Sequence, residues 1–133
     1  MLAEQDIYDA RFDVGVMIDV LEHFDNPADV LRVMGQSMNE IIVVVPNFSY
    51  LKQRLQALWG TVPFQNKPQR GGHKYWFNKK SLLEVVDKAG FVIVEQNNMY
   101  PKLGNHRGFL HGIFDNFSNL LAVSFAVRIR KRT

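Results

Sequence analysis

The sequence predicts a single α/β domain built on a mostly parallel sheet. Short apolar runs rich in β-branched residues alternate with segments of helical periodicity along the chain. The run 41–45 is apolar at every position, which is typical of a parallel strand covered on both faces. Nearly half of the 133 residues are apolar, so we expect a globular domain with a core of its own.

Four strands follow from these patterns. Apolar runs predict strands over 12–18, 40–45 and 91–95. Residues 121–130 alternate apolar and polar side chains, the period of a half-exposed closing strand. We expect this last strand to be antiparallel and the others parallel.

One helix is predicted after each of the first two strands. Asn26 can cap the first helix and Pro27 suits its first turn. Ser49 is expected to cap the second helix, which Gly60 ends. Helical spacing predicts the following inward residues: Val30, Leu31, Met34 and Met38 in the first helix, and Leu51, Leu55 and Leu58 in the second.

The second half of the chain reads as loop, helix, strand, short helix and strand. Residues 61–76 are predicted to form a loop, and a third helix is expected over 78–89 with Gly90 just beyond its end. A short helix is expected within 109–119. The inward residues of the third helix are predicted to be Leu82, Leu83 and Val86.

Composition limits the class of protein. The chain has no cysteine, which excludes disulfides and thiolate zinc sites and suits a reducing compartment. No apolar run approaches the roughly 20 residues of a membrane span, so we expect a cytoplasmic protein. The net charge is +3, with acids concentrated in residues 1–40 and bases in 41–133. The basic part is either an ordinary solvated surface or a surface for nucleic acid, lipid head groups or a phosphorylated small molecule.

The first strand poses a physical question. Residues 12–18 are apolar on both faces, as in a central strand, yet no predicted strand precedes them to cover the outer edge. Either a second copy of the chain pairs there, or an N-terminal set of strands is absent from the sequence. A third alternative is that residues 1–9 fold back over the edge.

Polar side chains follow the first two strands. In parallel sheets, ligands bind beyond the carboxyl ends of the strands, which selects residues 19–24 and 46–48. Asp19 and Glu22 carry negative charge that favours a cationic group, and His23 titrates near neutrality and can exchange a proton. The alternative is that the two acids cap local backbone and His23 lies on the surface.

Residues 71–77 form a second candidate site. Tyr75 and Trp76 could wall a pocket that His73 enters, and Lys79 opens the following helix, whose N-terminus suits an anion. The alternative is that the aromatic residues are core and the lysine is solvated. His106 and His111 have no partners at metal-ligand spacing, so no metal site is expected.

These segments together resemble the class I S-adenosylmethionine-dependent methyltransferases. Residues 12–14 and 19–27 look like the family's fourth strand and the start of the next helix, and 43–47 resemble the fifth strand and its end. The stretch 73–91, with a histidine, aromatic residues, a helix and Ala-Gly-Phe, is similar to the type 11, type 23 and MetW-like branch. The resemblance covers nearly the whole chain through the order and spacing of these motifs.

The resemblance implies a Rossmann-like methyltransferase sheet of which residues 1–133 supply strands four to seven, the C-terminal part of a single domain. It implies methyl transfer from S-adenosylmethionine, with the acceptor left open among small molecules, lipids, sugars and proteins; a small molecule, either neutral or anionic, is expected. The residues implied by the resemblance are Asp19, Val20 and Leu21 on the donor side and His23 and His73 facing the acceptor. From the residues themselves we expect the substrate to be bound by Asn47, Tyr75, Trp76 and Lys79.

The family's glycine-rich loop and the acid after its second strand have no counterpart in the sequence. We therefore expect an N-terminally truncated methyltransferase that neither binds the donor well nor is very active alone. The alternative is a non-enzymatic half-domain that pairs through its open first strand, as a homodimer or an accessory subunit. A nucleic-acid binder, suggested by the basic second half, is the third alternative and is not the expected one.

Overall fold

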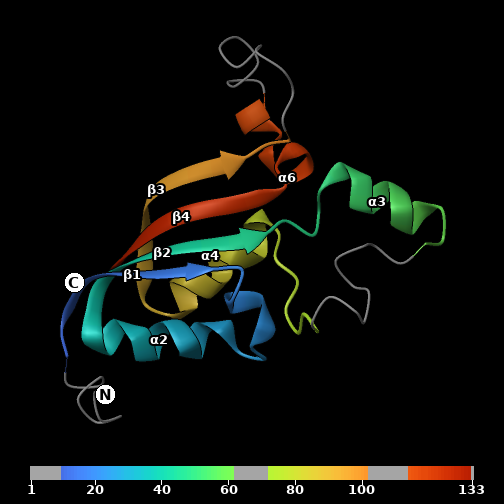
Figure 1. The fold of residues 1–133 in the computed structure, drawn as a ribbon. Helices are drawn as coiled ribbons and strands as arrows, with labels where there is room; N and C mark the ends of the chain where they lie inside the picture. Colours follow the sequence, from blue (N-terminus) through green and yellow to red (C-terminus); the bar gives the residue numbers. More distant parts are fainter. Residues whose placement is uncertain (1–9, 62–71, 102–113, 133) are drawn as a thin grey trace.

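Four strands form one sheet in the order β1-β2-β4-β3 (Figure 1). The computed structural model describes residues 10–61, 72–101 and 114–132. β1 and β2 are parallel, and β4 is antiparallel to both of its neighbours, β2 and β3. The strands are β1 (Phe12–Ile18), β2 (Met38–Pro46), β3 (Phe91–Met99) and β4 (Ser124–Lys131).

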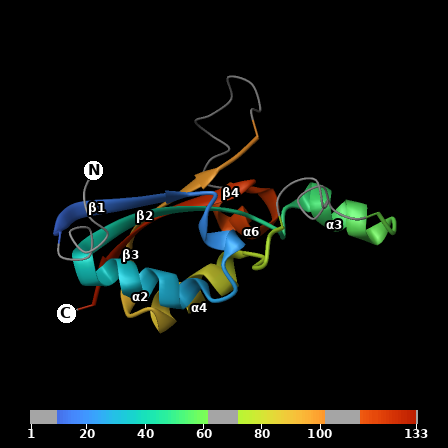
Figure 2. The same ribbon diagram turned by 60° about the horizontal axis from the view of Figure 1, so that its bottom comes forward.

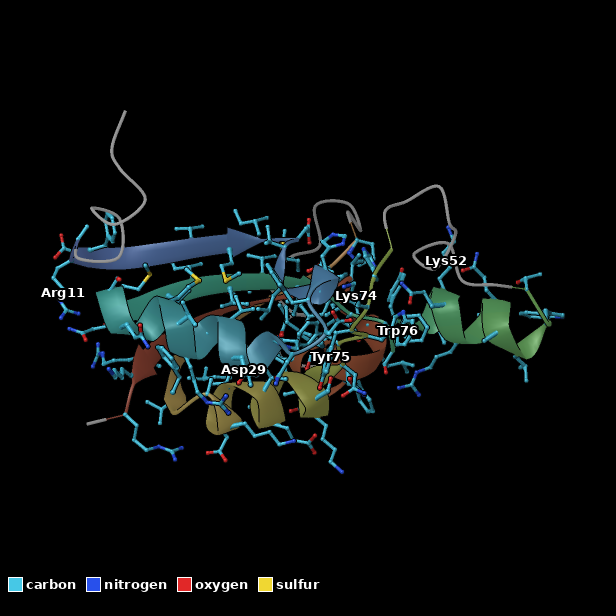
Figure 3. All side chains as sticks on the ribbon, turned by 90° about the horizontal axis from the view of Figure 1, so that it is seen from below. Arg11, Asp29, Lys52, Lys74, Tyr75 and Trp76 are labelled. Carbon is cyan, nitrogen blue, oxygen red and sulfur yellow. The ribbon has the colours of Figure 1, made fainter. Side chains whose placement is uncertain are left out.

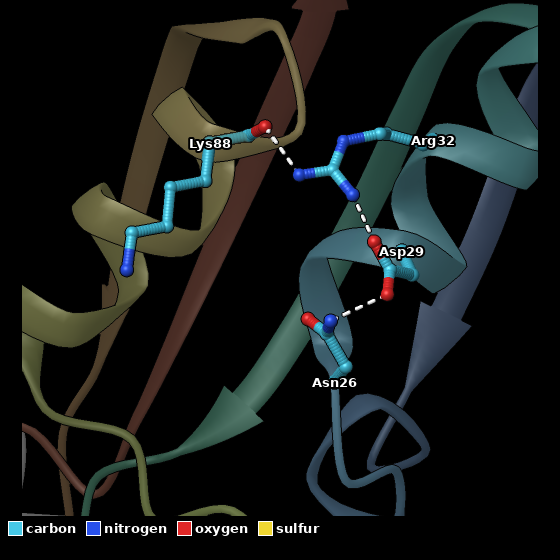
Figure 4. Close-up of polar contacts among 4 residues, drawn as sticks. All are labelled: Asn26, Asp29, Arg32 and Lys88. Carbon is cyan, nitrogen blue, oxygen red and sulfur yellow. Dashed lines mark hydrogen bonds and ion pairs between the residues drawn. The ribbon is translucent and has the colours of Figure 1, made fainter.

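The long helices α2 and α4 cover one face of this sheet (Figure 2). Arg32 on α2 pairs with Asp29 and donates a hydrogen bond of 2.9 Å to the carbonyl oxygen of Lys88, which ties the two helices together (Figure 4). No helix in the described residues is both long enough and apolar enough to cross a membrane. The helices are η1 (Leu21–His23), α2 (Pro27–Ser37), α3 (Leu51–Leu58), α4 (Lys79–Lys88) and α6 (Ser118–Leu121).

The predicted α/β class, the element order and the antiparallel last strand are confirmed. β4 lies between β2 and β3 rather than at an edge, and its alternation places Phe125, Val127 and Ile129 in the core. β3 is longer than expected and reaches Met99. The third helix and its terminal glycine are also confirmed, since Gly90 follows α4 at φ 82°. Asn78 and Ser81 form a reciprocal capping box at its start, which the sequence analysis did not predict.

The expectation that β2 is covered on both faces is wrong for the described residues. Ile41, Val43 and Val45 are fully buried against the helices, whereas Ile42 on the other face is 36% exposed. On the same uncovered face β1 exposes four apolar side chains, namely Phe12 (48%), Val14 (45%), Val16 (58%) and Ile18 (58%). Within the described residues β1 pairs only with β2 and lies at the sheet edge.

The predicted inward face of the second helix is also wrong. α3 extends beyond the sheet (Figure 1), so among the described residues its leucines do not enter the sheet core, and Leu58 is 80% exposed. The predicted cap at Ser49 is wrong as well, since the N-cap residue is Tyr50. The backbone N–H of Ser49 is instead bonded to the side-chain oxygen of Asn47 at 2.9 Å. In α4, Leu83 is exposed and Val85 is buried in its place.

Several sequence expectations fall outside the described residues. They concern residues 1–9, most of the loop 61–76, the beginning of the helix expected over 109–119, and His106 and His111. In the first predicted helix, Leu31 is buried as expected, but Met38 belongs to β2.

The two N-cap asparagines give a matched test of helix capping. Asn78 accepts a hydrogen bond from the backbone N–H of Ser81 at 2.9 Å, whereas Asn26 makes no side-chain bond to the backbone of α2. We expect Asn78→Ala to lower the free energy of unfolding by about 1 kcal/mol and Asn26→Ala to lower it by clearly less. Urea titrations followed by circular dichroism measure both, and equal losses would contradict the capping assignment.

Candidate functional site

The carboxyl ends of β1, β2 and β3 lie at one edge of the sheet, since β4 is antiparallel to both of its partners. At this edge β1 ends in Asp19, the only described non-glycine residue with positive φ, at 50°. Its backbone N–H remains bonded to the carbonyl oxygen of Val44 at 3.1 Å. A left-handed aspartate at the end of a strand is uncommon and marks a sharp change of direction into η1.

Glu22 on η1 joins this turn to the segment 72–77. Its carbonyl oxygen accepts two backbone hydrogen bonds, from the N–H of Lys74 at 2.9 Å and from that of Tyr75 at 3.0 Å. A second link further along the segment runs from the N–H of Phe48 to the carbonyl oxygen of Phe77 at 2.7 Å. Figure 3 shows Lys74, Tyr75 and Trp76 on this segment as it passes from the η1 side of the edge toward α3.

These backbone bonds bring His73 to Glu22 and His23. The Nε2 atom of His73 lies 4.0 Å from Oε1 of Glu22, and the rings of His73 and His23 meet edge to face with their centroids 5.0 Å apart. Glu22 is 1% exposed, and its Oε2 atom has no hydrogen-bond partner. The two candidate segments predicted separately from the sequence therefore lie in direct contact.

Burial shapes the electrostatics of this cluster. Desolvation raises the pKa of Glu22, and the negative charge of Asp19 raises it further. Desolvation lowers the pKa of His73, and the neighbouring His23 acts in the same direction. Both effects outweigh the opposing charge of Asp19 and favour the neutral form of His73, which can accept a proton.

The other predicted residues have distinct places. Asp19 and Val20 are exposed, whereas the side chain of Leu21 is fully buried in the core. Asn47 is also fully buried, and its amide nitrogen donates to the carbonyl oxygens of Asn119 (2.9 Å) and Ala122 (2.8 Å). Leu21 and Asn47 thus shape the edge from inside, and their contact with ligands stays a prediction.

Tyr75, Trp76 and Lys79 follow closely along the chain where it enters α4. Tyr75 packs on Phe77 with ring centroids 4.7 Å apart, while Trp76 is half exposed. The ammonium group of Lys79 lies 3.3 Å from the hydroxyl of Ser118. Their role in binding substrate is likewise untested by these contacts.

An apolar cavity of about 400 Å³ lies between α3 and the end of β3. The sequence analysis missed it, because its walls come from distant segments and the leucines of α3 were expected to face the core. The available signal was the concentration of aromatic residues near the strand ends. The described residues that line it include Tyr50, Leu51, Leu55, Trp59, Tyr100 and Phe114.

A comparison with protein families identifies the chain. A family model described as a methyltransferase domain matches residues 2–96, well over half of the sequence. The chain belongs to this methyltransferase family. A search of curated protein sequences found no significant match.

Solved structures agree with this assignment at the level of the fold. The methyltransferase chain is similar to magnesium protoporphyrin IX methyltransferase from Synechocystis PCC 6803, solved with bound S-adenosylhomocysteine (TM-score 0.56, 12% identity). It is also similar to S-adenosylmethionine-dependent methyltransferases from Thermotoga maritima (0.59, 14%) and Mesorhizobium loti (0.58, 12%). These matches cover 92%, 92% and 91% of this chain but only 46%, 57% and 62% of the respective solved chains.

The Rossmann-like methyltransferase sheet predicted from the sequence is confirmed, and the comparisons support S-adenosylmethionine as the methyl donor of this fold. The sequence predicted no metal site. Among the described residues, however, Glu22, His23 and His73 offer three ligand-type atoms that all lie within 4.8 Å of one another.

The buried carboxylate of this methyltransferase should make its stability depend on pH. Because the pKa of Glu22 is higher in the folded chain, the wild type bears a cost of ionisation that is complete above the folded pKa and fades as pH falls toward the unfolded value. Glu22→Gln should therefore raise the free energy of unfolding by about 1–2 kcal/mol at pH 8, and by less at pH 5.

Urea unfolding at both pH values in buffer containing EDTA measures this difference. The matched control is Glu84→Gln, which neutralises an exposed carboxylate of α4 and should change stability little at either pH. An equal gain at pH 8 and pH 5 would show that folding does not raise the pKa of Glu22.

Proposed function

We propose that this chain forms the acceptor side of an S-adenosylmethionine-dependent methyltransferase acting on a small molecule. The observation that carries the proposal is the convergence of Glu22, His23 and His73 at the carboxyl edge of the sheet. Ligands bind at this edge in open α/β sheets. The stretch 73–91 further supports a place in the type 23, MetW-like branch of the family.

Asp19 and Val20 are proposed to face the donor. Both are exposed at the end of β1, and the buried side chain of Leu21 anchors the turn that presents them. S-adenosylmethionine supplies a methyl group carried on a cationic sulfur and leaves as neutral S-adenosylhomocysteine. The carboxylate of Asp19 favours that positive charge.

His23 and His73 are proposed to face the acceptor. Neutral His73 can take the proton that the acceptor loses, and His23 lies against its ring. Holding the acceptor in line with the donor supplies most of the remaining rate enhancement in such a transfer.

The cavity beside α3 offers room for an apolar or aromatic part of the acceptor, as most ligand sites are lined by such side chains. Lys79 and the exposed ring of Trp76 are proposed to hold an anionic end of the acceptor. Asn47 contributes by fixing the backbone between β2 and α6.

A complete donor site is proposed to need further polypeptide on the β1 side of the sheet. Four apolar side chains of β1 lie exposed on one face, and the chain spans only part of the length of the solved methyltransferases. Strands four to seven of the methyltransferase sheet would then come from this chain, and the glycine-rich loop that holds the donor from the additional polypeptide.

Isothermal titration with S-adenosylhomocysteine tests this division. We expect negligible heat with the 133-residue chain and saturable binding by a version extended on the β1 side with a donor-binding segment. Asp19→Asn should then weaken binding of S-adenosylmethionine more than that of neutral S-adenosylhomocysteine. Tight binding by the short chain would refute the need for additional polypeptide, and no binding by the longer chain would refute the donor assignment.

A second candidate function is pairing through β1, as a homodimer or an accessory subunit. The open edge and the exposed apolar face of β1 favour it. Light scattering on the eluting protein should then give twice 15.4 kDa, and Val16→Lys should return the mass to that of a monomer. Val33→Lys, at an equally exposed valine of α2, is the matched control, and a wild-type monomer would exclude the homodimer.

A further inference from the structure

We propose that Glu22, His23 and His73 together bind one divalent transition-metal ion of the zinc type. The inference concerns binding alone and does not rest on the methyl transfer proposed above. It draws on the spacing of the three side chains, on an unpartnered buried oxygen, and on the local charge.

The spacing is close to that of a coordination shell. All three ligand-type atoms lie within 4.8 Å of one another, and the Glu22–His73 pair is at 4.0 Å. Ligands bound tetrahedrally at zinc distances of about 2.0–2.2 Å lie about 3.4 Å apart. Side-chain rotations that bring the ligand atoms closer by at most about 1.4 Å would therefore give zinc-ligand spacing. The backbone can stay in place, held by the hydrogen bonds from Lys74 and Tyr75 to Glu22.

The unpartnered oxygen gives an independent reason. Oε2 of Glu22 is buried without a hydrogen bond, although nearly all buried polar atoms in proteins have a partner. A cation in front of the carboxylate would satisfy this oxygen and offset the cost of burying its charge.

The surrounding charge also favours a cation. Asp19 lies near enough to influence both Glu22 and His73. The nearest lysine in the segment, Lys74, has its ammonium group paired with Asp25 at 2.7 Å, so its charge is compensated. The cluster therefore contains the carboxylates of Asp19 and Glu22 and the imidazoles of His23 and His73. The one lysine of the adjoining segment is already paired with Asp25.

The donor set indicates the class of metal. Two imidazoles and one carboxylate are ligands typical of zinc and its transition-metal neighbours, whereas calcium and magnesium prefer oxygen alone. Three protein ligands leave a position open for water or a substrate oxygen, as in catalytic zinc sites. With the ion bound, the imidazoles are ligands and accept no proton, so metal binding and proton acceptance exclude each other.

Isothermal titration of tag-free, EDTA-treated protein with zinc chloride tests the site. We expect one zinc ion to bind per chain. Glu22→Gln and His73→Ala should each weaken the zinc affinity by more than the roughly tenfold to hundredfold loss that follows removal of a residue hydrogen-bonded to a metal ligand. Glu84→Gln is the matched control and should bind as the wild type does. Absence of stoichiometric binding, or unchanged affinity in Glu22→Gln, would overturn the proposal.

A second measurement does not depend on whether those variants fold. Cobalt(II) added to the wild type should give the visible absorption of a four- or five-coordinate site, and zinc should displace it. The double variant His106→Ala/His111→Ala should keep this spectrum, since the proposal gives these histidines no part. Loss of the spectrum in the double variant, or an octahedral spectrum of hydrated cobalt in the wild type, would contradict the assignment.

Discussion

The carbonyl oxygen of Glu22 holds the candidate site together. It accepts two backbone hydrogen bonds from Lys74 and Tyr75, so it joins the turn after β1 to a segment far away in the sequence. A backbone link of this kind fixes both segments whatever their side chains do. The position of His73 beside His23, the burial of Glu22 and the course of the chain toward α4 all follow from it.

Most of the sheet could be predicted because its signals are local. The apolar runs of β1 and β2, the alternation of β4 and the glycine after α4 each report on a few neighbouring residues. The wrong expectations concern which faces are covered. Ile42 and the leucines of α3 look like core residues in the sequence. An apolar pattern shows that a face can be buried, but not whether another described segment covers it.

The site was predicted in pieces for the same reason. Residues 19–24 and 71–77 each carried chemistry, but the bonds that join them run between backbone atoms and leave no trace in residue type. The metal-ligand set was missed because Glu22 and His23 are adjacent, whereas His73 lies on another segment. Rules based on sequence spacing detect metal ligands that lie on one helix or loop. They fail when the fold brings ligands together from distant segments.

Three departures from ordinary protein chemistry lie together at one edge of the sheet. Asp19 adopts a left-handed backbone, Glu22 keeps a buried oxygen without a partner, and burial lowers the pKa of His73. α4, by contrast, follows the local rules closely, with a reciprocal cap at one end and a glycine at the other. Departures of this kind that cluster at one place are often functional. The edge after β1 is therefore where binding and chemistry are best sought, since a fold selected only for stability would have no reason to retain a buried, unpartnered carboxylate there.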